Sequence, residues 1–160
     1  MKLVVQRVTE ASVTVDGVCT GSVDAGYLVL VGCRTGDEIK DADYLASRLT
    51  ALRIFEDQNG KMNLSITQTG GSVLLVSQFT LYADTRKGNR PGFDQAGNPA
   101  QAKVLFDYFT TQMQRILGED KVATGVFGAH MKVSLVNDGP VTVELCSDNQ
   151  PWHLGDGRTA

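Results

Sequence analysis

Several polar residues gather where one predicted strand ends. The apolar run Val73-Leu74-Leu75-Val76 is typical of a buried strand, and Ser77-Gln78-Phe79-Thr80 follows it directly. A strand end of this kind offers hydroxyl, amide and backbone N–H groups, which are the donors that stabilise an oxyanion in acyl transfer. The same tetrapeptide is also compatible with an ordinary strand end whose hydroxyls bond the local backbone. Alone, it is weak evidence for hydrolysis.

A conventional general base is hard to find for these hydroxyls. A nucleophilic Ser or Thr needs an adjacent base, usually a histidine, and the chain has only His130 and His153. His130 alternates with Lys132 and Ser134 and is expected to face solvent, and His153 lies near the C-terminus. The chain also has no GxSxG, GxGxxG or GxxxxGK[ST] motif. The sequence therefore predicts no cofactor, and an esterase built on this segment would work without a conventional base.

A second polar segment, Asn137-Asp138-Gly139-Pro140-Val141-Thr142, has the composition of a turn. Glycine supplies an unusual φ and proline fixes the next one. We expect this turn to join two antiparallel strands, since apolar residues alternate on both sides of it. Asn137 and Thr142 are expected to brace it through side-chain to backbone hydrogen bonds.

Arg7 shares a predicted strand face with Leu3 and Val5, where a charge needs a specific partner. Two interpretations are open. Arg7 supports the Gly139-Pro140 turn, or the strand slips by one residue and Arg7 faces solvent.

The remaining pattern indicates a mixture of strands and helices. Alternation around Asp16-Gly17 predicts strands at 2–9, 12–16 and 18–23, followed by a more buried strand at 27–33. A helix over about 37–52 follows a capping-box spacing at Thr35, and residues 54–66 look irregular around an Asn59-Gly60 turn.

The second half begins with a long loop at 84–97, rich in Gly, Pro and charge. Asn98-Pro99 then predicts the start of a second helix, with an apolar stripe facing the core. This stripe consists of Ala102, Leu105, Phe106, Phe109, Met113, Ile116 and Leu117. We therefore expect a single α+β domain with a mostly antiparallel, curled or barrel-like β-sheet and two packed helices. Residues 1–146 would form the domain and residues 147–160 a partly ordered tail.

Composition excludes several classes of protein. With 160 residues, 42% hydrophobic and 21% charged, the chain fits one soluble domain. No apolar run is long enough to span a membrane, and the N-terminus lacks a secretion signal, so we expect a cytoplasmic protein. The net charge of −3 argues against an extended phosphate-binding surface. One basic cluster, 86–90, is either a solvated loop or a flexible contact with phosphates.

The three cysteines, Cys19, Cys33 and Cys146, have no metal-binding spacing. We expect them to be buried small hydrophobes, and we predict no metal site.

Taken together, the two polar segments resemble the D-aminoacyl-tRNA deacylase (D-tyrosyl-tRNA deacylase) family. The opening MKLVVQRV, the segment GNRPGF and the run TGVFGAHMKVSLVNDGPVT are also similar to that family, so the resemblance covers residues 1 to about 146. It implies a cofactor-independent homodimer that hydrolyses the ester between a D-amino acid, or glycine, and the 3′ end of tRNA. A protein with this charge should bind only the acceptor end of the tRNA.

The resemblance also implies roles for individual residues. Ser77, Gln78, Phe79 and Thr80 would line the catalytic pocket, with the Phe79 N–H as oxyanion donor. Because an aminoacyl ester is already activated, positioning of the carbonyl and of a water could suffice; Thr80 as a covalent nucleophile is the alternative.

Two further pairs of residues take roles from the resemblance. A cis Gly139-Pro140 pair would enter the partner's pocket and reject L side chains, while glycine, which has no side chain, would be admitted. Phe127 and Met131 either contact the terminal adenosine or are simply core residues.

Two other functions remain open. A related deacylase with a trans Gly-Pro bond removes a small L-amino acid, although Leu81 and Asn137-Asp138 favour the D-specific group. The fold could also serve as a non-catalytic nucleic-acid-associated module, because fold does not determine function.

Overall fold

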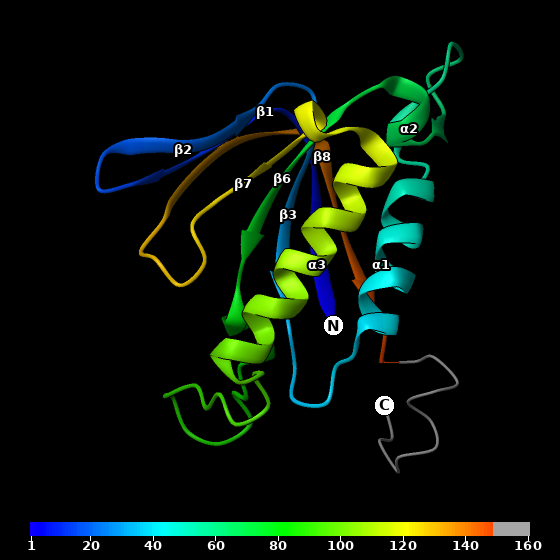
Figure 1. Cartoon of the computed structure of the whole chain (residues 1–160). Helices are drawn as coiled ribbons and strands as arrows, with labels where there is room; N and C mark the ends of the chain where they lie inside the picture. Colours follow the sequence, from blue (N-terminus) through cyan, green and yellow to red (C-terminus); the bar gives the residue numbers. More distant parts are fainter. Residues whose placement is uncertain (149–160) are drawn as a thin grey trace.

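The long strand β1 (Lys2–Val15) organises the sheet because three other strands pair with it. It is antiparallel to β2 (Val18–Val23), to β3 (Gly26–Gly32) and to β8 (Lys132–Cys146). Beyond β3 the sheet continues in parallel with β6 (Ser72–Ser77) and β7 (Val122–Thr124). The computed structural model describes residues 1–148 and shows this sheet edge-on beside two long helices (Figure 1).

The sheet curls until its two ends meet. β2 lies at one end of the strand order and β7 at the other, yet a side chain at Gly21 of β2 would lie 2.6 Å from the Thr124 carbonyl oxygen of β7. Only glycine allows this approach. The predicted single-domain, barrel-like α+β fold is confirmed, and the pairings of β1 make the sheet largely antiparallel.

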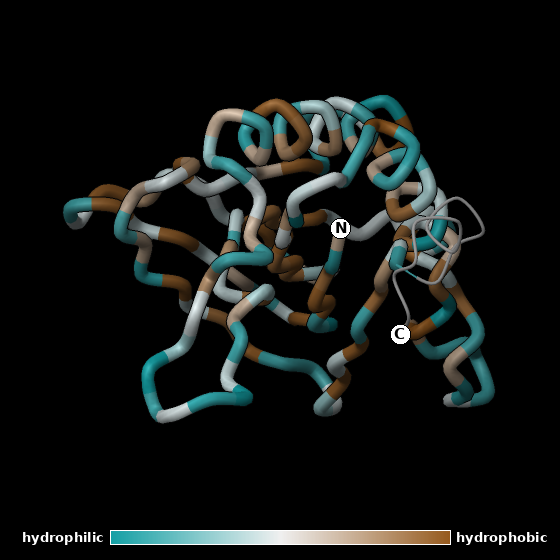
Figure 2. The backbone as a smooth tube through the Cα atoms, turned by 90° about the horizontal axis from the view of Figure 1, so that it is seen from below, coloured by the Kyte–Doolittle hydropathy of each residue, from teal (hydrophilic) through white to brown (hydrophobic). Residues whose placement is uncertain are grey.

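The helices α1 (Ile39–Ala51) and α3 (Pro99–Leu117) pack side by side over one face of the sheet (Figure 1). The main core lies between the helices and the sheet, and includes Leu3, Tyr27, Leu49, Leu75 and Phe109. A second cluster, including Val13 and Leu74, fills the inside of the curl. Figure 2 shows hydrophobic segments beneath the helices and hydrophilic loops at the periphery. Burial of these side chains, roughly 1.5–3 kcal/mol each, is the main force holding the helices on the sheet.

The predicted hairpin at Asp16-Gly17 is confirmed. Both residues have positive φ, +50° and +82°, as a two-residue turn between twisted strands requires. The strands predicted at 2–9 and 12–16 are a single strand, β1, because β8 pairs with it on both sides of the intervening residues.

The start of α1 differs from the prediction. Glu38, not Thr35, is the N-cap, and it forms a capping box with Asp41. The carboxylate of Asp37 is instead bonded to the chain's own N-terminal ammonium, 2.7 Å away. A contact with Met1 cannot be read from the local spacing of residues 35–38.

Residues 54–66 are more regular than predicted. The strands β4 (Phe55–Glu56) and β5 (Met62–Leu64) form a small hairpin around the predicted Asn59-Gly60 turn, and a short helix, α2 (Ile66–Thr69), follows. Two 3-10 turns, η1 (Phe79–Tyr82) and η2 (Glu119–Lys121), complete the described elements.

The second helix begins as predicted. The Asn98 side chain accepts a hydrogen bond from Ala100 N–H, and Pro99 occupies the first turn of α3. Of the predicted stripe, Leu105, Phe106, Phe109 and Met113 are buried, whereas Ile116 is 45% exposed.

Two peripheral parts of the molecule, Cys19 and the start of the predicted tail, bear on the predictions. Cys19 is exposed on β2, contrary to the expectation that all three cysteines are buried, while Cys33 is buried. Of the predicted tail, Ser147 is buried against Met1, and Asp148 pairs with Arg34. Residues 149–160 lie outside the described part of the chain.

No helix within residues 1–148 has the length and apolar character needed to cross a membrane.

Candidate active site

A cavity of about 750 Å³ opens at the carboxyl ends of β3 and β6. The first turn of α3 and the loop between β7 and β8 form its other sides. Its lining combines apolar side chains with a few polar groups, an arrangement typical of small-ligand sites. The lining residues are Val31, Cys33, Val76, Ser77, Gln78, Phe79, Phe93, Ala96, Gly97, Asn98, Pro99, Ala102, Phe106, Phe127, Gly128, Ala129, His130, Met131 and Val133.

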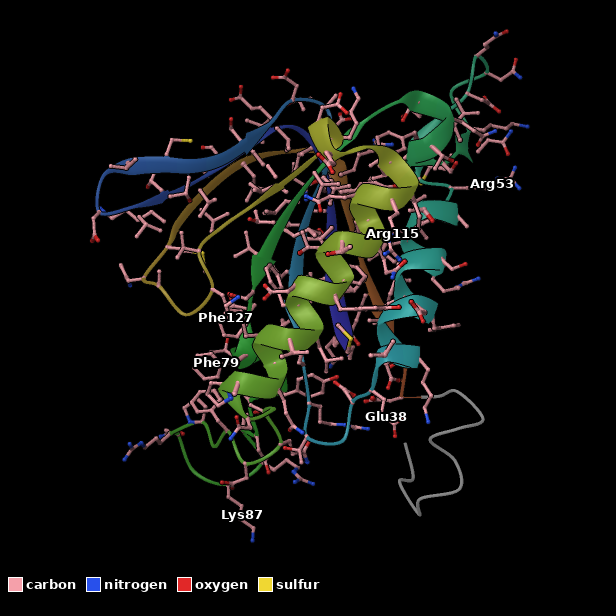
Figure 3. The ribbon with its side chains drawn as sticks, in the orientation of Figure 1. Glu38, Arg53, Phe79, Lys87, Arg115 and Phe127 are labelled. Atoms are coloured by element: carbon pink, nitrogen blue, oxygen red, sulfur yellow. The ribbon has the colours of Figure 1, made fainter. Side chains whose placement is uncertain are left out.

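Aromatic rings form two pairs around this cavity. Phe79 and Phe93 meet edge to face with ring centres 5.0 Å apart, and Phe106 and Phe127 lie 5.9 Å apart. Phe79 is 57% exposed, which is unusual for a large apolar side chain. Figure 3 shows Phe79 and Phe127 on the same side of the molecule, beside the N-terminal half of α3. The exposed ring surface suits a planar, partly apolar ligand.

The backbone leaves its strand geometry at the edge of this cavity. Gln78 N–H still donates to Val31 O at 2.8 Å, and the chain then enters η1, where Leu81 N–H donates to Gln78 O at 3.3 Å. The first N–H groups of a helical turn have no acceptor inside it. The N–H groups of Phe79 and Thr80 occupy that position, so they are available to an external acceptor.

The Thr80 side chain lies outside the cavity lining. It is exposed, and its hydroxyl accepts a hydrogen bond from the Gln78 side-chain amide. An amide cannot take a proton from a hydroxyl under neutral conditions. The contacts of Thr80 therefore give it no activating base.

Among the residues of this cavity that sequence reasoning missed, three have side chains that can hydrogen-bond. His130 is exposed, as expected, yet it lies at the cavity rim, and Asn98 and Cys33 also contribute to the wall. Burial, followed by the charge of Asp37, raises the pKa of Cys33 to about 12, so its thiol is neutral at physiological pH. Only the fold brings these residues together, because they follow three different elements.

The Asn137–Thr142 segment is a bulge within one strand, not a turn between two strands. In the register of β1 with β8, Gln6 faces Thr142 and Val8 faces Asn137. Residues 138–141 therefore project from the ladder opposite Arg7. The prediction of two antiparallel strands was wrong because β8 pairs with β1 on both sides of the bulge.

The bulge is braced from both sides. The Asn137 side chain accepts from Val141 N–H at 2.7 Å and donates to Thr142 Oγ1 at 3.2 Å. Gly139 has a φ of +143°, and the Gly139–Pro140 peptide bond is cis.

Arg7 fastens the bulge to the core. It is only 5% exposed, so of the two interpretations of its position, the buried one is right. Arg7 Nε donates to the Asp138 carbonyl at 2.9 Å, and a terminal nitrogen donates to Ile54 O at 2.6 Å. The carboxylates of Asp138 and Glu56 lie 3.2 and 3.9 Å from the guanidinium. This set of partners offsets the cost of burying the charge.

The predicted site residues fall into two groups within one chain. Ser77, Gln78 and Phe79 share the cavity with Phe127 and Met131. The other group surrounds the bulge, and none of its members lines that cavity: Arg7, Asn137, Gly139, Pro140 and Thr142. Gly139 and Pro140 are exposed, so the bulge is presented outward.

The chain is similar to proteins of one family along most of its length. The family model described as D-Tyr-tRNA(Tyr) deacylase matches residues 4–146. A "D-aminoacyl-tRNA deacylase" of Thermomicrobium roseum is 56% identical over 92% of this chain and 94% of its own. One of Koribacter versatilis is 54% identical over 94% of this chain and 99% of its own.

Two solved structures have the same fold. One, titled "c-Myc DNA Unwinding Element Binding Protein", has a TM-score of 0.88 and 40% identity, and covers 92% of this chain and 99% of its own. The other, titled "Structural Analysis of a probable eukaryotic D-amino acid tRNA deacylase", has a TM-score of 0.79 at 16% identity, over 90% of this chain and 97% of its own, and supports the fold alone. From the match over residues 4–146 and the identity to these relatives, the chain belongs to the D-Tyr-tRNA(Tyr) deacylase family.

Proposed function

We propose that the protein is a D-aminoacyl-tRNA deacylase that acts as a homodimer in the cytoplasm and also hydrolyses glycyl-tRNA. The observation that carries this proposal is the division of the site. One chain holds a cavity with open backbone donors, and the same chain presents a braced bulge away from that cavity. A two-fold dimer can bring the bulge of one subunit to the cavity of the other.

Catalysis rests on positioning and on the backbone. The Phe79 N–H binds the carbonyl oxygen of the ester and stabilises the oxyanion as water attacks. The ribose hydroxyl beside the ester assists the attacking water, and Ser77 and Gln78 orient the ester from the cavity wall. Thr80 acts as a bystander, since among residues 1–148 the partner of its hydroxyl is the Gln78 amide, which cannot act as a base.

Chirality is sorted by crowding at the α-carbon. Gly139 and Pro140 of the partner subunit close one side of the cavity, where the side chain of an L-amino acid would lie. The side chain of a D-amino acid points away from this side of the cavity, so its identity is not recognised. Glycine has no side chain to reject, so it is hydrolysed as well.

The end of the tRNA provides most of the binding. The terminal adenine packs against Phe127 and Met131 in the apolar part of the cavity, where stacking on an aromatic ring contributes about 1–3 kcal/mol per base. In the basic loop, Arg86 is already paired with Asp84 at 2.7 Å. Few cations remain for phosphates, in keeping with a substrate held by its acceptor end.

The test is single-turnover deacylation of D-tyrosyl-, glycyl- and L-tyrosyl-tRNA by the purified protein. The D and glycine esters should be hydrolysed and the L ester should remain. Activity per subunit should fall on dilution below the dimer dissociation constant. Hydrolysis of a small L-aminoacyl ester without the D ester would instead indicate the related L-specific deacylase.

A non-catalytic nucleic-acid-associated role is the second candidate. It is favoured by one structural relative, at 40% identity, whose title describes a DNA unwinding element binding protein. Nucleic-acid binding without any ester hydrolysis in the same assay would support it.

A further inference from the structure

Three buried polar atoms near the proposed catalytic turn have no hydrogen-bond partner among residues 1–148. They are the Tyr82 hydroxyl, one terminal nitrogen of Arg34 and one carboxylate oxygen of Asp148. Asp37 belongs to the same group of residues, and its carboxylate oxygen binds the N-terminal ammonium, 2.7 Å away. Buried polar atoms are nearly always satisfied by protein or by ordered water, so three such atoms in one place point to a ligand.

Hydrogen bonds, ion pairs and a ring contact connect Tyr82, Arg34, Asp37 and Asp148 into one cluster. Arg34 binds Asp148 through its other terminal nitrogen at 3.0 Å, and its guanidinium carbon lies 5.9 Å from the centre of the Tyr82 ring. Arg34 N–H also donates to Asp37. The Met1 ammonium joins Asp37 to Ser147, whose hydroxyl accepts from it at 2.8 Å. The cluster thus holds both ends of the folded chain.

The composition of the cluster indicates a neutral ligand. The positive charges of Arg34 and the Met1 ammonium balance the two carboxylates of Asp37 and Asp148. The unpartnered atoms are a donor nitrogen of Arg34, an acceptor oxygen of Asp148 and the Tyr82 hydroxyl, which can do both. Water is the small neutral molecule that matches such a mixed set.

Tyr82 links the cluster to the site. It is the last residue of η1, the turn that begins with Phe79, and it is only 6% exposed. Lys2 and Arg34 both lie against its ring, with the Lys2 nitrogen 5.6 Å from the ring centre. Burial, and then the charges of Asp37 and Asp148, raise the pKa of Tyr82, so its hydroxyl keeps its proton. The other side of the turn packs on Gly32, where a side chain would lie 3.0 Å from Leu81 Cβ.

We propose that this cluster binds ordered water and that Tyr82, held by that water, is the residue that positions η1 and hence the Phe79 N–H. The N-terminus and residues 147–148 are thereby coupled to the turn that holds the proposed oxyanion donor. The positioning role rests on the proposed function, whereas the water site does not.

Tyr82→Phe tests the positioning role, because it keeps the ring and removes only the hydroxyl. With untagged protein, kcat on D-aminoacyl-tRNA should fall about tenfold per folded molecule, since small misplacements of a catalytic group are costly, and KM should stay within about twofold. Amide exchange of Leu81 and Ala83, whose N–H groups close η1, should accelerate while that of Ala102 in α3 does not.

Tyr108→Phe is the matched control. Its hydroxyl donates to Asp43 at 2.8 Å between the two helices, on the exposed side of the molecule. This variant should change neither kcat nor exchange in η1.

Three outcomes separate the possibilities. Unchanged kcat and unchanged exchange in Tyr82→Phe, with an active wild-type protein, would overturn the positioning role. If the wild-type protein is inactive, the proposed function is rejected. Amide exchange of Leu81 and Ala83 in Tyr82→Phe would then still test whether Tyr82 holds η1 in place. A high-resolution crystal structure should show water bonded to Tyr82 and Arg34; protein groups in those places would overturn the water site.

Discussion

The chain interrupts its strands at two places that differ in almost every respect. At the end of β6 the backbone turns into η1, exposes the Phe79 ring and lines a cavity. In the middle of β8 it bulges outward, is fixed by the buried Arg7, and lines no part of that cavity. The first place has space and open donors but little that would select a ligand. The second is shaped and braced by the contacts of Arg7 and Asn137.

This difference teaches how two functions can be kept apart within one fold. The proposed oxyanion donor needs an unpaired N–H, and the N–H of Phe79 lies where a ladder ends. The proposed steric selector needs a fixed shape, and the bulge lies where a ladder continues on both sides and the Arg7 guanidinium bonds to Asp138 and Ile54. If the two meet only across a dimer, each subunit supplies half of a working site.

Phe79→Pro is expected to have the largest effect because it removes the proposed oxyanion donor itself. Proline is tolerated at the first position of a helical turn, and Gln78 before it lies outside the α region that proline disfavours, with φ of −145° and ψ of 85°. Loss of one oxyanion donor costs about 10²–10³ in rate. Single-turnover deacylation of D-tyrosyl-tRNA measures the loss.

Phe79→Ala is the control for this substitution, since it removes the ring and keeps the N–H. Its rate should be much closer to wild type, with weaker tRNA binding from the lost aromatic surface. Equal losses in the two variants would show that the ring, not the N–H, is what matters.

Gly139→Ala should have the second-largest effect, because it deforms the selector without touching the cavity. At φ of +143° an added methyl would lie 2.7 Å from Val141 Cγ2 and 2.9 Å from Val141 N. Hydrolysis of D-tyrosyl- and glycyl-tRNA should fall together, by about tenfold or more, as the bulge shifts against the substrate. Gly17→Ala is the control: it also has a positive φ, but no neighbour within 4 Å, and should leave the rates unchanged.

Mixed dimers of these two variants test whether the cavity of one subunit works with the bulge of the other. Phe79→Pro lacks the donor and Gly139→Ala lacks the selector, so a mixed dimer contains one pairing of an intact cavity with an intact bulge. Random exchange should recover about a quarter of the wild-type sites, because half of the dimers are mixed and each has one intact site. No recovery after exchange would mean that the cavity and the bulge do not cooperate across subunits.

The sequence predicted the first of these regions better than the second, and the reason is physical. The run Val73–Val76 ends at polar residues, and Asn98-Pro99 caps α3, so local patterns were enough to predict the two elements that border the cavity, although not that they meet there. The bulge was taken for a turn because Gly-Pro is a local turn signal, whereas its strand is continued by pairing with the distant β1. The capping box was placed at Thr35 instead of Glu38 for a similar reason, since Asp37 beside it binds the distant first residue of the chain. His130 was correctly expected to be exposed, but only the loop's path over the sheet brings it to the cavity.

Thr80→Ala should have the smallest effect, and it decides between two mechanisms. The Thr80 hydroxyl is exposed, lies outside the cavity lining and, within the described part of the chain, bonds the Gln78 amide, which cannot act as its base. Its removal frees the Gln78 side chain but leaves the backbone of η1 in place, so the single-turnover rate should stay within about threefold of wild type. Thr111→Ala, which removes a hydroxyl bonded to Asp107 O on the surface of α3, is the control and should leave the single-turnover rate unchanged. Removing a true nucleophile would instead cost on the order of 10⁴-fold or more, as in hydrolases with a covalent intermediate. A loss of that size in folded Thr80→Ala would assign the chemistry to the side chain, and the N–H of Phe79 would then only assist it.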